Sequence, residues 1–263
     1  MTPDLLTARL VRKQCLSASA QCFHLDFVLD GQEDFVFTPG QFVSVVAQDA
    51  GGKQQMRAYS IASAPHGNRF ALCLNRVEDG FFSNRLADMQ TGDTMRIQSP
   101  LGYFTLREPL TDSILIATGT GIAPMRGFVQ WLFPSDGPDR SGGLRIWLIY
   151  GTRHATELYY RDEFEAVSAR HANFHYLPTI SRAAAEWSGL RGYVQEHVVR
   201  VLAERGAGLQ QPAPAPEQAT PAAGGSFDIH AYVCGLSPMI NAVRERLKEL
   251  GWNRKQIITE RYD

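Results

Sequence analysis

The sequence predicts two domains of different class: an antiparallel β-barrel over residues 1–110, followed by a parallel α/β domain over residues 111–263. Two observations support this prediction. Short strands separated by turn residues fill the first part, which is typical of a small antiparallel barrel. From about residue 112, continuous apolar strands alternate with helices, which indicates an open parallel sheet of the Rossmann-like kind.

Six strands are expected in the first domain: 5–16, 22–29, 41–47, 57–63, 69–77 and 94–99. They alternate between apolar and polar residues or are rich in β-branched and aromatic residues. Turn pairs separate them, such as Pro39-Gly40, Gly51-Gly52 and Gly92-Asp93. One short helix is expected at 83–89.

The second domain is expected to contain strands at 113–118, 146–150, 174–180 and 230–235, and helices at 124–133, 157–170, 194–205 and 238–250. The last helix has Ser237 as its expected N-cap, Pro238 at its first position and Gly251 just beyond its end. Residues 206–226 are rich in Pro, Ala, Gly and Gln and have no apolar period. They predict a mobile surface insertion without a function of its own.

Composition excludes several classes of protein. The 26 Lys and Arg residues balance 27 Asp and Glu residues, so net charge gives no reason to expect nucleic acid or an anionic membrane as a partner. No apolar run reaches the roughly 18 residues that a membrane span needs, and the first residues do not resemble a secretory signal. The four cysteines are scattered, which predicts reduced thiols, no metal site and a cytoplasmic location.

Three motifs point to nucleotide chemistry. In ATGTGIAPMRGF (117–128), Gly119 and Gly121 follow a buried strand and open a helix, where backbone amides can bind phosphate; the alternative is a plain tight turn. RAYSIAS (57–63) places Arg57, Tyr59 and Ser60 where they could hold a flavin, or is an ordinary half-buried strand. GFFSNRL (80–86) could begin a helix over phosphate, or is a Ser-capped helix.

Taken together, these motifs are more specific. The ordered set RxYS at 57–60, GxxS at 80–83, GTGIAP at 119–124, Ser-Arg at 181–182, Cys-Gly at 234–235 and Glu-x-Tyr at 260–262 resembles the ferredoxin–NADP reductase superfamily. The resemblance covers the chain apart from residues 206–226. It implies that the barrel binds FAD, that the α/β domain binds the nicotinamide cofactor, and that the flavin lies between the two domains.

The resemblance also implies roles for individual residues. The flavin would be held by Arg57, Ala58, Tyr59, Ser60, Gly80, Phe81, Phe82 and Ser83, with Asn75 and Val77 as secondary candidates. The nicotinamide cofactor would be held by Thr118, Gly119, Thr120, Gly121, Pro124, Cys234 and Gly235. Ser60, Cys234, Glu260 and Tyr262 would be the catalytic set, with Tyr262 stacked on the flavin. Without the resemblance, the Glu-x-Tyr segment could equally be a solvated tail.

NADPH rather than NADH is expected from charge, because a 2′-phosphate needs cationic and hydroxyl partners. The chain offers Ser181 and Arg182, followed by the candidates Arg191, Tyr193 and Gln195. Arg126 also resembles the NADPH-specific members of the family, while Arg153 lies in a segment too loosely defined to assign. The alternative interpretation of these residues is a solvated basic edge.

The expected function is an FAD-dependent reductase that takes hydride from NADPH and passes single electrons to a ferredoxin or flavodoxin on a separate chain. Weak candidates for a docking patch are Arg9, Arg12, Lys13 and Arg69, and a monomer is expected. Two alternatives stay open: a reductase component of a multicomponent oxygenase or other pathway, and a flavin-binding redox-sensing module without steady turnover. An acidic Asp263 after the terminal aromatic residue is expected to affect how easily Tyr262 is displaced.

Overall fold

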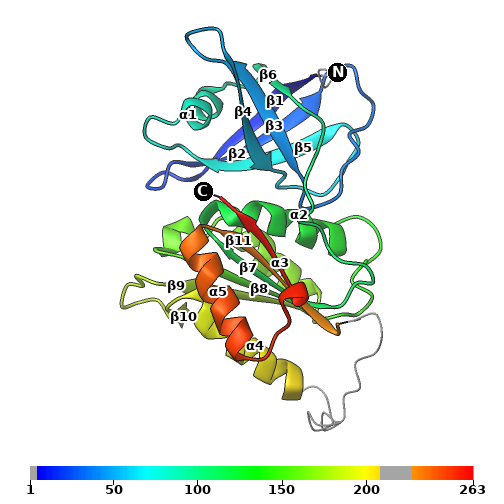
Figure 1. Cartoon of the computed structure of the whole chain (residues 1–263), viewed down its shortest axis with the longest axis vertical. Coiled ribbons are helices and arrows are strands. Elements are labelled where there is room, and N and C mark those ends of the chain that lie inside the picture. The colour runs from blue at the N-terminus through cyan, green and yellow to red at the C-terminus, as the bar shows by residue number, and fades with distance from the viewer. Residues whose placement is uncertain (1–4, 208–226, 263) are drawn as a thin grey trace.

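A computed structural model describes residues 5–207 and 227–262, which form two six-stranded sheets, one above the other in Figure 1. The expected insertion at 206–226 lies almost wholly outside the described residues, and so does Asp263. Each sheet has its own hydrophobic core, and a further cluster of apolar side chains includes residues of both. In the described part of the chain, no helix is both long enough and apolar enough to cross a membrane.

The first sheet is antiparallel and has the strand order β4-β3-β6-β1-β2-β5. Its strands are β1 (Leu6–Ser17), β2 (Cys22–Leu29), β3 (Phe42–Gln48), β4 (Gln54–Ser60), β5 (Arg69–Asn75) and β6 (Thr94–Ile97). An isolated bridge between Ile61 and Leu72 joins the segment after β4 to β5, which closes the sheet into a barrel. Helix α1 (Phe81–Asp88) packs against β5. The expected barrel is therefore confirmed.

Aromatic packing fills the barrel. The Phe27 and Phe70 rings stack with centroids 5.3 Å apart, and Phe35 lies 5.2 Å from Phe70. All three side chains are buried, so they remove a large apolar area from water and stabilise the closed sheet.

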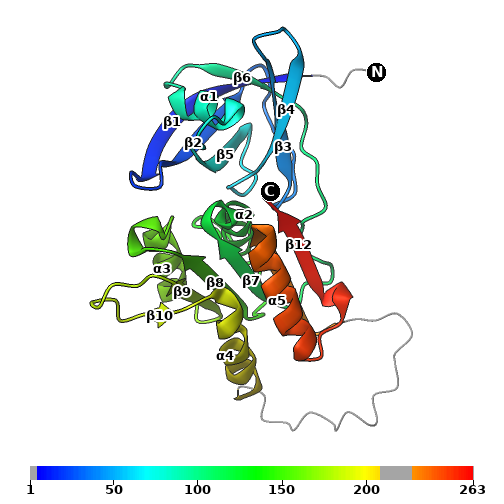
Figure 2. The same ribbon diagram turned by 60° about the vertical axis from the view of Figure 1, so that its left-hand side comes forward.

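The second sheet is entirely parallel, with the order β10-β9-β8-β7-β11-β12. Its strands are β7 (Asp112–Thr118), β8 (Ile146–Thr152), β9 (Phe174–Ile180), β10 (Leu190–Arg191), β11 (Ile229–Gly235) and β12 (Ile257–Arg261). Its helices are α2 (Ile122–Leu132), α3 (Arg161–Arg170), α4 (Val194–Ala207) and α5 (Ser237–Glu249). In Figure 2, β12 forms one edge of this sheet and carries the C-terminal end of the chain toward the barrel.

Several expected boundaries are wrong. The strand expected at 57–63 is β4 (Gln54–Ser60), because the chain leaves β4 after Ser60 to form the bridge at Ile61. Helix α3 begins only at Arg161, after a 3-10 turn at Ala155–Glu157. The N-cap of α5 is Leu236 rather than Ser237, whereas Gly251 does lie beyond the helix with a φ of +83°.

Contacts between the barrel and the second domain engage Arg126 of α2. Its Nε donates to Glu163 of α3 at 2.8 Å, and its Nη1 donates to the Ala62 carbonyl at 2.6 Å. The guanidinium also lies 4.6 Å from the centre of the Tyr160 ring. Because these partners engage Arg126, its side chain contributes to the contact between the two domains.

Candidate functional site

The carboxyl-terminal ends of two strands, one from each domain, lie in contact. Ser60 ends β4, and its Oγ donates a 2.6 Å hydrogen bond to Oε1 of Glu260 on β12. Ser60 is buried and Glu260 is half-buried. Burial raises the pKa of the Glu260 carboxyl above its usual value, while the hydrogen bond from Ser60 opposes that rise. The alternative of a solvated tail is therefore wrong for Glu260, because this residue belongs to the sheet.

Cys234 completes this cluster from the next strand. It lies opposite Glu260 in the parallel pairing of β11 with β12, and the two side chains are in contact, with Sγ and Oε1 4.0 Å apart. Cys234 is fully buried, and burial raises the pKa of its thiol well above the ordinary value. The thiol is therefore neutral at physiological pH.

Tyr262 follows β12 and packs against the core cluster that contains Cys234. Its backbone N–H donates to the Gly235 carbonyl at 3.1 Å, which fixes the segment beside the end of β11. Its hydroxyl oxygen is buried without a hydrogen-bond partner among the described residues. Such an orphaned polar atom costs free energy unless a further group satisfies it, so it marks a place where a ligand atom would stabilise the fold.

The strand that leads to Ser60 presents the expected flavin-binding residues. Arg57 and Ala58 are exposed, and Tyr59 is half-buried against the barrel core. Burial raises the pKa of Tyr59 to about 12, although the positive charge of Arg57 opposes this. The strand therefore has an open surface along the residues that precede Ser60.

Helix α1 begins next to this strand in a form suited to an anion. Its N-cap is Gly80, no side chain caps its first amides and no acidic residue lies in its first turn. The Ser83 hydroxyl turns back to Val77 N and Gly80 O instead, so the expected alternative of an ordinary Ser-capped helix is wrong. Phe82 is buried and Phe81 is 42% exposed. The free amides can donate to a phosphate.

The two secondary candidates differ. The Asn75 side-chain amide donates to Ala20 O at 2.7 Å and to the Tyr159 hydroxyl at 3.3 Å, so it is occupied by the protein. Val77 is 56% exposed beside the start of α1.

The glycine motif leaves β7 through a 3-10 turn at Gly119–Gly121 and enters α2. Here too no side chain caps the helix and no acid lies in its first turn. A Cβ on Gly121 would lie 2.2 Å from the Cys234 carbonyl oxygen, whereas one on Gly119 would meet nothing within 4 Å. Gly121 is thus needed for close packing on β11, and Gly119 borders open space. Thr118 and Thr120 are half-buried, and Pro124 is buried in the first turn of α2.

Ser181 and Arg182 follow β9 at the same edge of the sheet. Arg182 is exposed, its backbone N–H donates to the Arg153 carbonyl at 3.0 Å, and Ser181 N donates to Thr152 O. The backbones of Arg153 and Arg182 are therefore adjacent. Tyr193 is 62% exposed and Gln195 is half-buried. The sequence left Arg153 unassigned, because its proximity to Arg182 depends on the pairing of β8 with β9.

Arg191 contacts the turn that precedes it in the sequence. Its guanidinium donates to four backbone carbonyls of the preceding turn, those of Ala183, Ala184, Ala185 and Trp187. These contacts hold the turn that follows Arg182. Arg191 therefore shapes the segment that carries Arg182.

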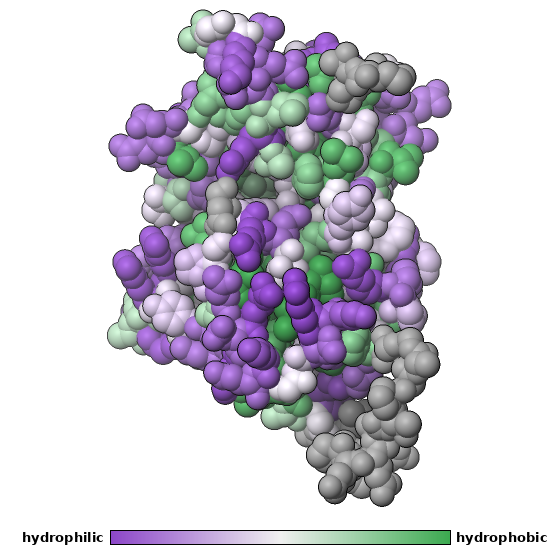
Figure 3. Space-filling model, in the orientation of Figure 1, coloured by the Kyte–Doolittle hydropathy of each residue, from purple (hydrophilic) through white to green (hydrophobic). Residues whose placement is uncertain are grey.

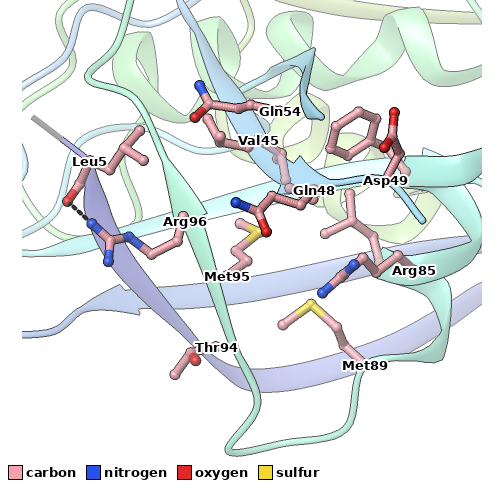
Figure 4. Close-up of a pocket in the computed structure, with 14 residues that line it drawn as sticks. Leu5, Val45, Gln48, Asp49, Gln54, Arg85, Met89, Thr94, Met95 and Arg96 are labelled. Carbon is pink, nitrogen blue, oxygen red and sulfur yellow. Dashed lines mark hydrogen bonds between the residues drawn. The ribbon is translucent and has the colours of Figure 1, made fainter. Parts of the chain in front are cut away.

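Two hollows adjoin the first domain. One, of about 590 Å³, lies between α1, β3 and β6, and Figure 4 shows Arg85, Met89 and Met95 around it. Of the expected site residues, only Phe82 lines it, so it is separate from the Ser60–Glu260 contact. The other, of about 860 Å³, borders Glu260 and β12.

The hollow beside Glu260 has a basic rim that sequence reasoning missed. Arg107, Arg254 and Lys255 line it, together with Tyr103, whose side chain is 91% exposed. No ion pair of these three cations is observed among the described residues. In Figure 3, a hollow is visible where the two domains meet.

The chain matches two family models, an oxidoreductase FAD-binding domain over residues 7–106 and an oxidoreductase NAD-binding domain over residues 115–245. Ferredoxin–NADP reductase B of Sorangium cellulosum is 38% identical over 261 residues, 97% of each chain. The toluate 1,2-dioxygenase electron transfer component of Pseudomonas putida is 29% identical over 82% of this chain, which spans only 55% of that protein. A crystal structure of a ferredoxin NADP+ reductase from Neisseria gonorrhoeae with bound FAD and NADP has a TM-score of 0.73, 22% identity and 98% coverage of each chain.

Proposed function

The chain belongs to the ferredoxin–NADP reductase family of oxidoreductases, and on this basis we propose that it oxidises NADPH through FAD and passes single electrons to a small acidic carrier protein, a ferredoxin or flavodoxin. The observation that carries the proposal is the cluster of Ser60, Cys234, Glu260 and Tyr262. Both domains contribute to it, at the point where a flavin between them would meet a nicotinamide. We take residues 1–110 as the FAD domain and 111–263 as the NADP domain.

FAD fits the residues present. The orphaned Tyr262 hydroxyl, the open surface along Arg57 and Ala58, and the uncapped first amides of α1 are each accounted for by a bound flavin nucleotide. In this proposal, β4 binds the flavin and α1 with Gly80 and Ser83 binds its pyrophosphate. When bound, FAD accepts a hydride from NADPH and releases the electrons one at a time.

The four clustered residues would then have distinct tasks. Ser60 holds Glu260 by its hydrogen bond, and the raised pKa of Glu260 suits a carboxyl that exchanges a proton close to the reaction. Cys234 presents a small neutral group, which lets a nicotinamide ring approach closely without a buried charge. Tyr262 would cover the flavin face and would have to move for the nicotinamide to reach it.

For NADPH, the turn at Thr118–Gly121 offers uncapped amides and open space at Gly119 for the pyrophosphate. Arg182 and Arg153 are the cations available for the 2′-phosphate, with Ser181 and Tyr193 beside them. Arg126 and Arg191 have other partners. The preference for NADPH therefore depends on an arginine pair of which the sequence identified one member.

An acidic carrier would dock at the hollow beside Glu260, because Arg107, Arg254 and Lys255 place positive charge around it. Three of the four weak sequence candidates fit less well. Arg9 pairs with Asp30, Arg12 lies 3.9 Å from Asp26, and Lys13 donates to backbone carbonyls. Replacing both Arg254 and Lys255 with Gln should raise KM for ferredoxin about five- to tenfold at low salt. The exposed Arg200→Gln is the control, and an unchanged KM in the double variant would contradict this docking site.

A second candidate function is suggested by the toluate dioxygenase component among the relatives, namely electron supply to an oxygenase. It uses the same cluster but a dedicated acceptor, so comparing ferredoxin, flavodoxin and an oxygenase as acceptors distinguishes the two. We propose that the chain acts as a monomer in the cytoplasm, which its four free cysteines support, since thiols stay reduced there.

The decisive experiment is an absorption spectrum of the purified protein, followed by NADPH or NADH in the absence of oxygen. A yellow protein bleached much faster by NADPH supports the proposal. Arg182→Ala should then raise KM for NADPH about tenfold, equivalent to about 1.4 kcal/mol, and leave KM for NADH unchanged. A colourless protein that neither binds FAD nor oxidises NADPH would refute it. A yellow protein that is reduced but transfers no electrons onward would indicate the redox-sensing alternative.

A further inference from the structure

Two buried thiols lie in contact on the side of the barrel that faces the second domain. Cys22 begins β2 and Cys73 lies on β5, and their sulfur atoms are 3.8 Å apart. In the antiparallel pairing, Cys73 is opposite His24, two residues from Cys22, so the two side chains share one face of the sheet. A disulfide needs an S–S distance of about 2.05 Å, so each sulfur would have to move by only about 0.9 Å.

The surroundings of the pair make the two sulfurs unequal. The hydrogen-bond contact with Cys22 lowers the pKa of the Cys73 thiol, as do the Tyr160 hydroxyl and the positive charge of Arg126, although burial opposes them. The same contact raises the pKa of Cys22. Cys73 is 5% exposed and Cys22 is fully buried. These opposite directions favour the thiolate on Cys73 rather than on Cys22.

We propose that Cys22 and Cys73 form a redox-active dithiol, which hydrogen peroxide oxidises to an intramolecular disulfide. The Cys73 thiolate attacks one peroxide oxygen and becomes a sulfenic acid, releasing hydroxide. The Cys22 sulfur then attacks Cys73 and displaces that oxygen as water. In sum, two thiols and one peroxide give one disulfide and two waters, and a dithiol reductant reverses the change.

The position of the pair connects its oxidation state to the domain contact. Cys22 and Cys73 belong to the apolar cluster that also contains Tyr159 from the second domain. Asn75 donates to the Tyr159 hydroxyl, and Tyr160 is hydrogen-bonded to His24 at 2.9 Å. Drawing the sulfurs together changes the contacts of both tyrosines, so the disulfide alters the surface on which the second domain rests.

In the test, the holoenzyme with all its thiols reduced is treated with hydrogen peroxide. The remaining thiols are then blocked under denaturing conditions, and the peptides are mapped by mass spectrometry. We expect two of the four thiols to be lost, a Cys22–Cys73 cross-linked peptide to appear, and dithiothreitol to restore all four. Cys22→Ser should stop at a sulfenic acid on Cys73 that dimedone traps. Cys15→Ser, which changes an exposed thiol on the neighbouring strand β1, should still give the Cys22–Cys73 cross-linked peptide as the wild type does.

Oxidation confined to Cys15, or a disulfide that forms as readily in Cys73→Ser between other cysteines, would overturn the proposal. The proposal would also be overturned if the Cys22–Cys73 pair stayed fully reduced while peroxide oxidised Cys15. The wild-type peptide map gives this answer even if a variant folds poorly. Because added peroxide and a mass readout need no turnover, the result is independent of the reductase assay.

Discussion

The two glycines in the turn after β7 provide a test that separates packing from ligand access. Gly121 has a φ of −59°, which alanine adopts freely, but its Cβ would lie 2.2 Å from the Cys234 carbonyl oxygen and 2.6 Å from the carbonyl carbon. Since ordinary contacts begin near 3.4 Å, α2 and β11 must separate by about 1 Å. Overpacking of this kind costs about 1–3 kcal/mol, which lowers Tm by roughly 2–12 °C for Gly121→Ala.

Gly119 borders open space and has a φ of +53°, so Gly119→Ala should cost only about 1 kcal/mol of backbone strain. Its new methyl group would occupy the space assigned to the pyrophosphate, and KM should rise for NADPH and NADH alike. Gly142→Ala is the matched control, because Gly142 has a φ of +61° and equally open surroundings. Tm and the KM values for NADPH and NADH are measured for the three variants Gly121→Ala, Gly119→Ala and Gly142→Ala. An unchanged Tm in Gly121→Ala, or equal KM values for Gly119→Ala and Gly142→Ala, would refute the reasoning.

Two further predictions concern half-buried carboxylates. The pKa of Glu260 is raised above its usual 4.5, so just above that pH the native protein holds more protons than the unfolded chain, and stability falls as pH rises through this window. Glu260→Gln should remove that fall, and Tm profiles against pH that coincide with those of the wild type would contradict the shift. Glu163→Ala leaves the largely buried Arg126 without its carboxylate and should lower the free energy of unfolding by about 1–3 kcal/mol. The exposed Glu204→Ala should lower it by less than about 1 kcal/mol. Equal losses of unfolding free energy in a denaturant titration would rule out a stabilising role for the Arg126–Glu163 pair.

Local signals were enough to predict much of the fold. Continuous apolar runs located β7, β8 and β11, and the glycine motif correctly marked the junction between β7 and α2. The C-terminal strand β12 was missed because its sequence, IITER, is short and begins directly after a 3-10 turn. The segment is a strand because it pairs with β11, and its own residue pattern does not predict one.

Side-chain roles were harder to predict, because a cation's partner comes from a distant part of the chain. Arg126 resembles the NADPH-specific relatives and Arg191 is a candidate for the phosphate, and in the structure Arg126 pairs with Glu163 while Arg191 donates to the carbonyls of a turn. Arg153 was left aside, yet it lies beside Arg182 once β8 and β9 pair. Residue type and spacing indicate which groups can bind phosphate, and only the fold shows which remain available.

The register of β12 determines whether the four clustered residues can act together. Glu260 faces Cys234 and Ser60 because β11 and β12 pair in one parallel register, and a slip of one residue would turn the Glu260 side chain to the opposite face. A capping box precedes the strand and fixes that register. The Gln256 side chain accepts from the backbone N–H of Asn253, and the Asn253 side chain accepts from a backbone N–H of the 3-10 turn that follows it. The Gln256 side chain also donates to the Ile229 carbonyl at the start of β11. The position of the Glu260 carboxyl, for which we propose a catalytic role, therefore depends on residues at the far end of its strand.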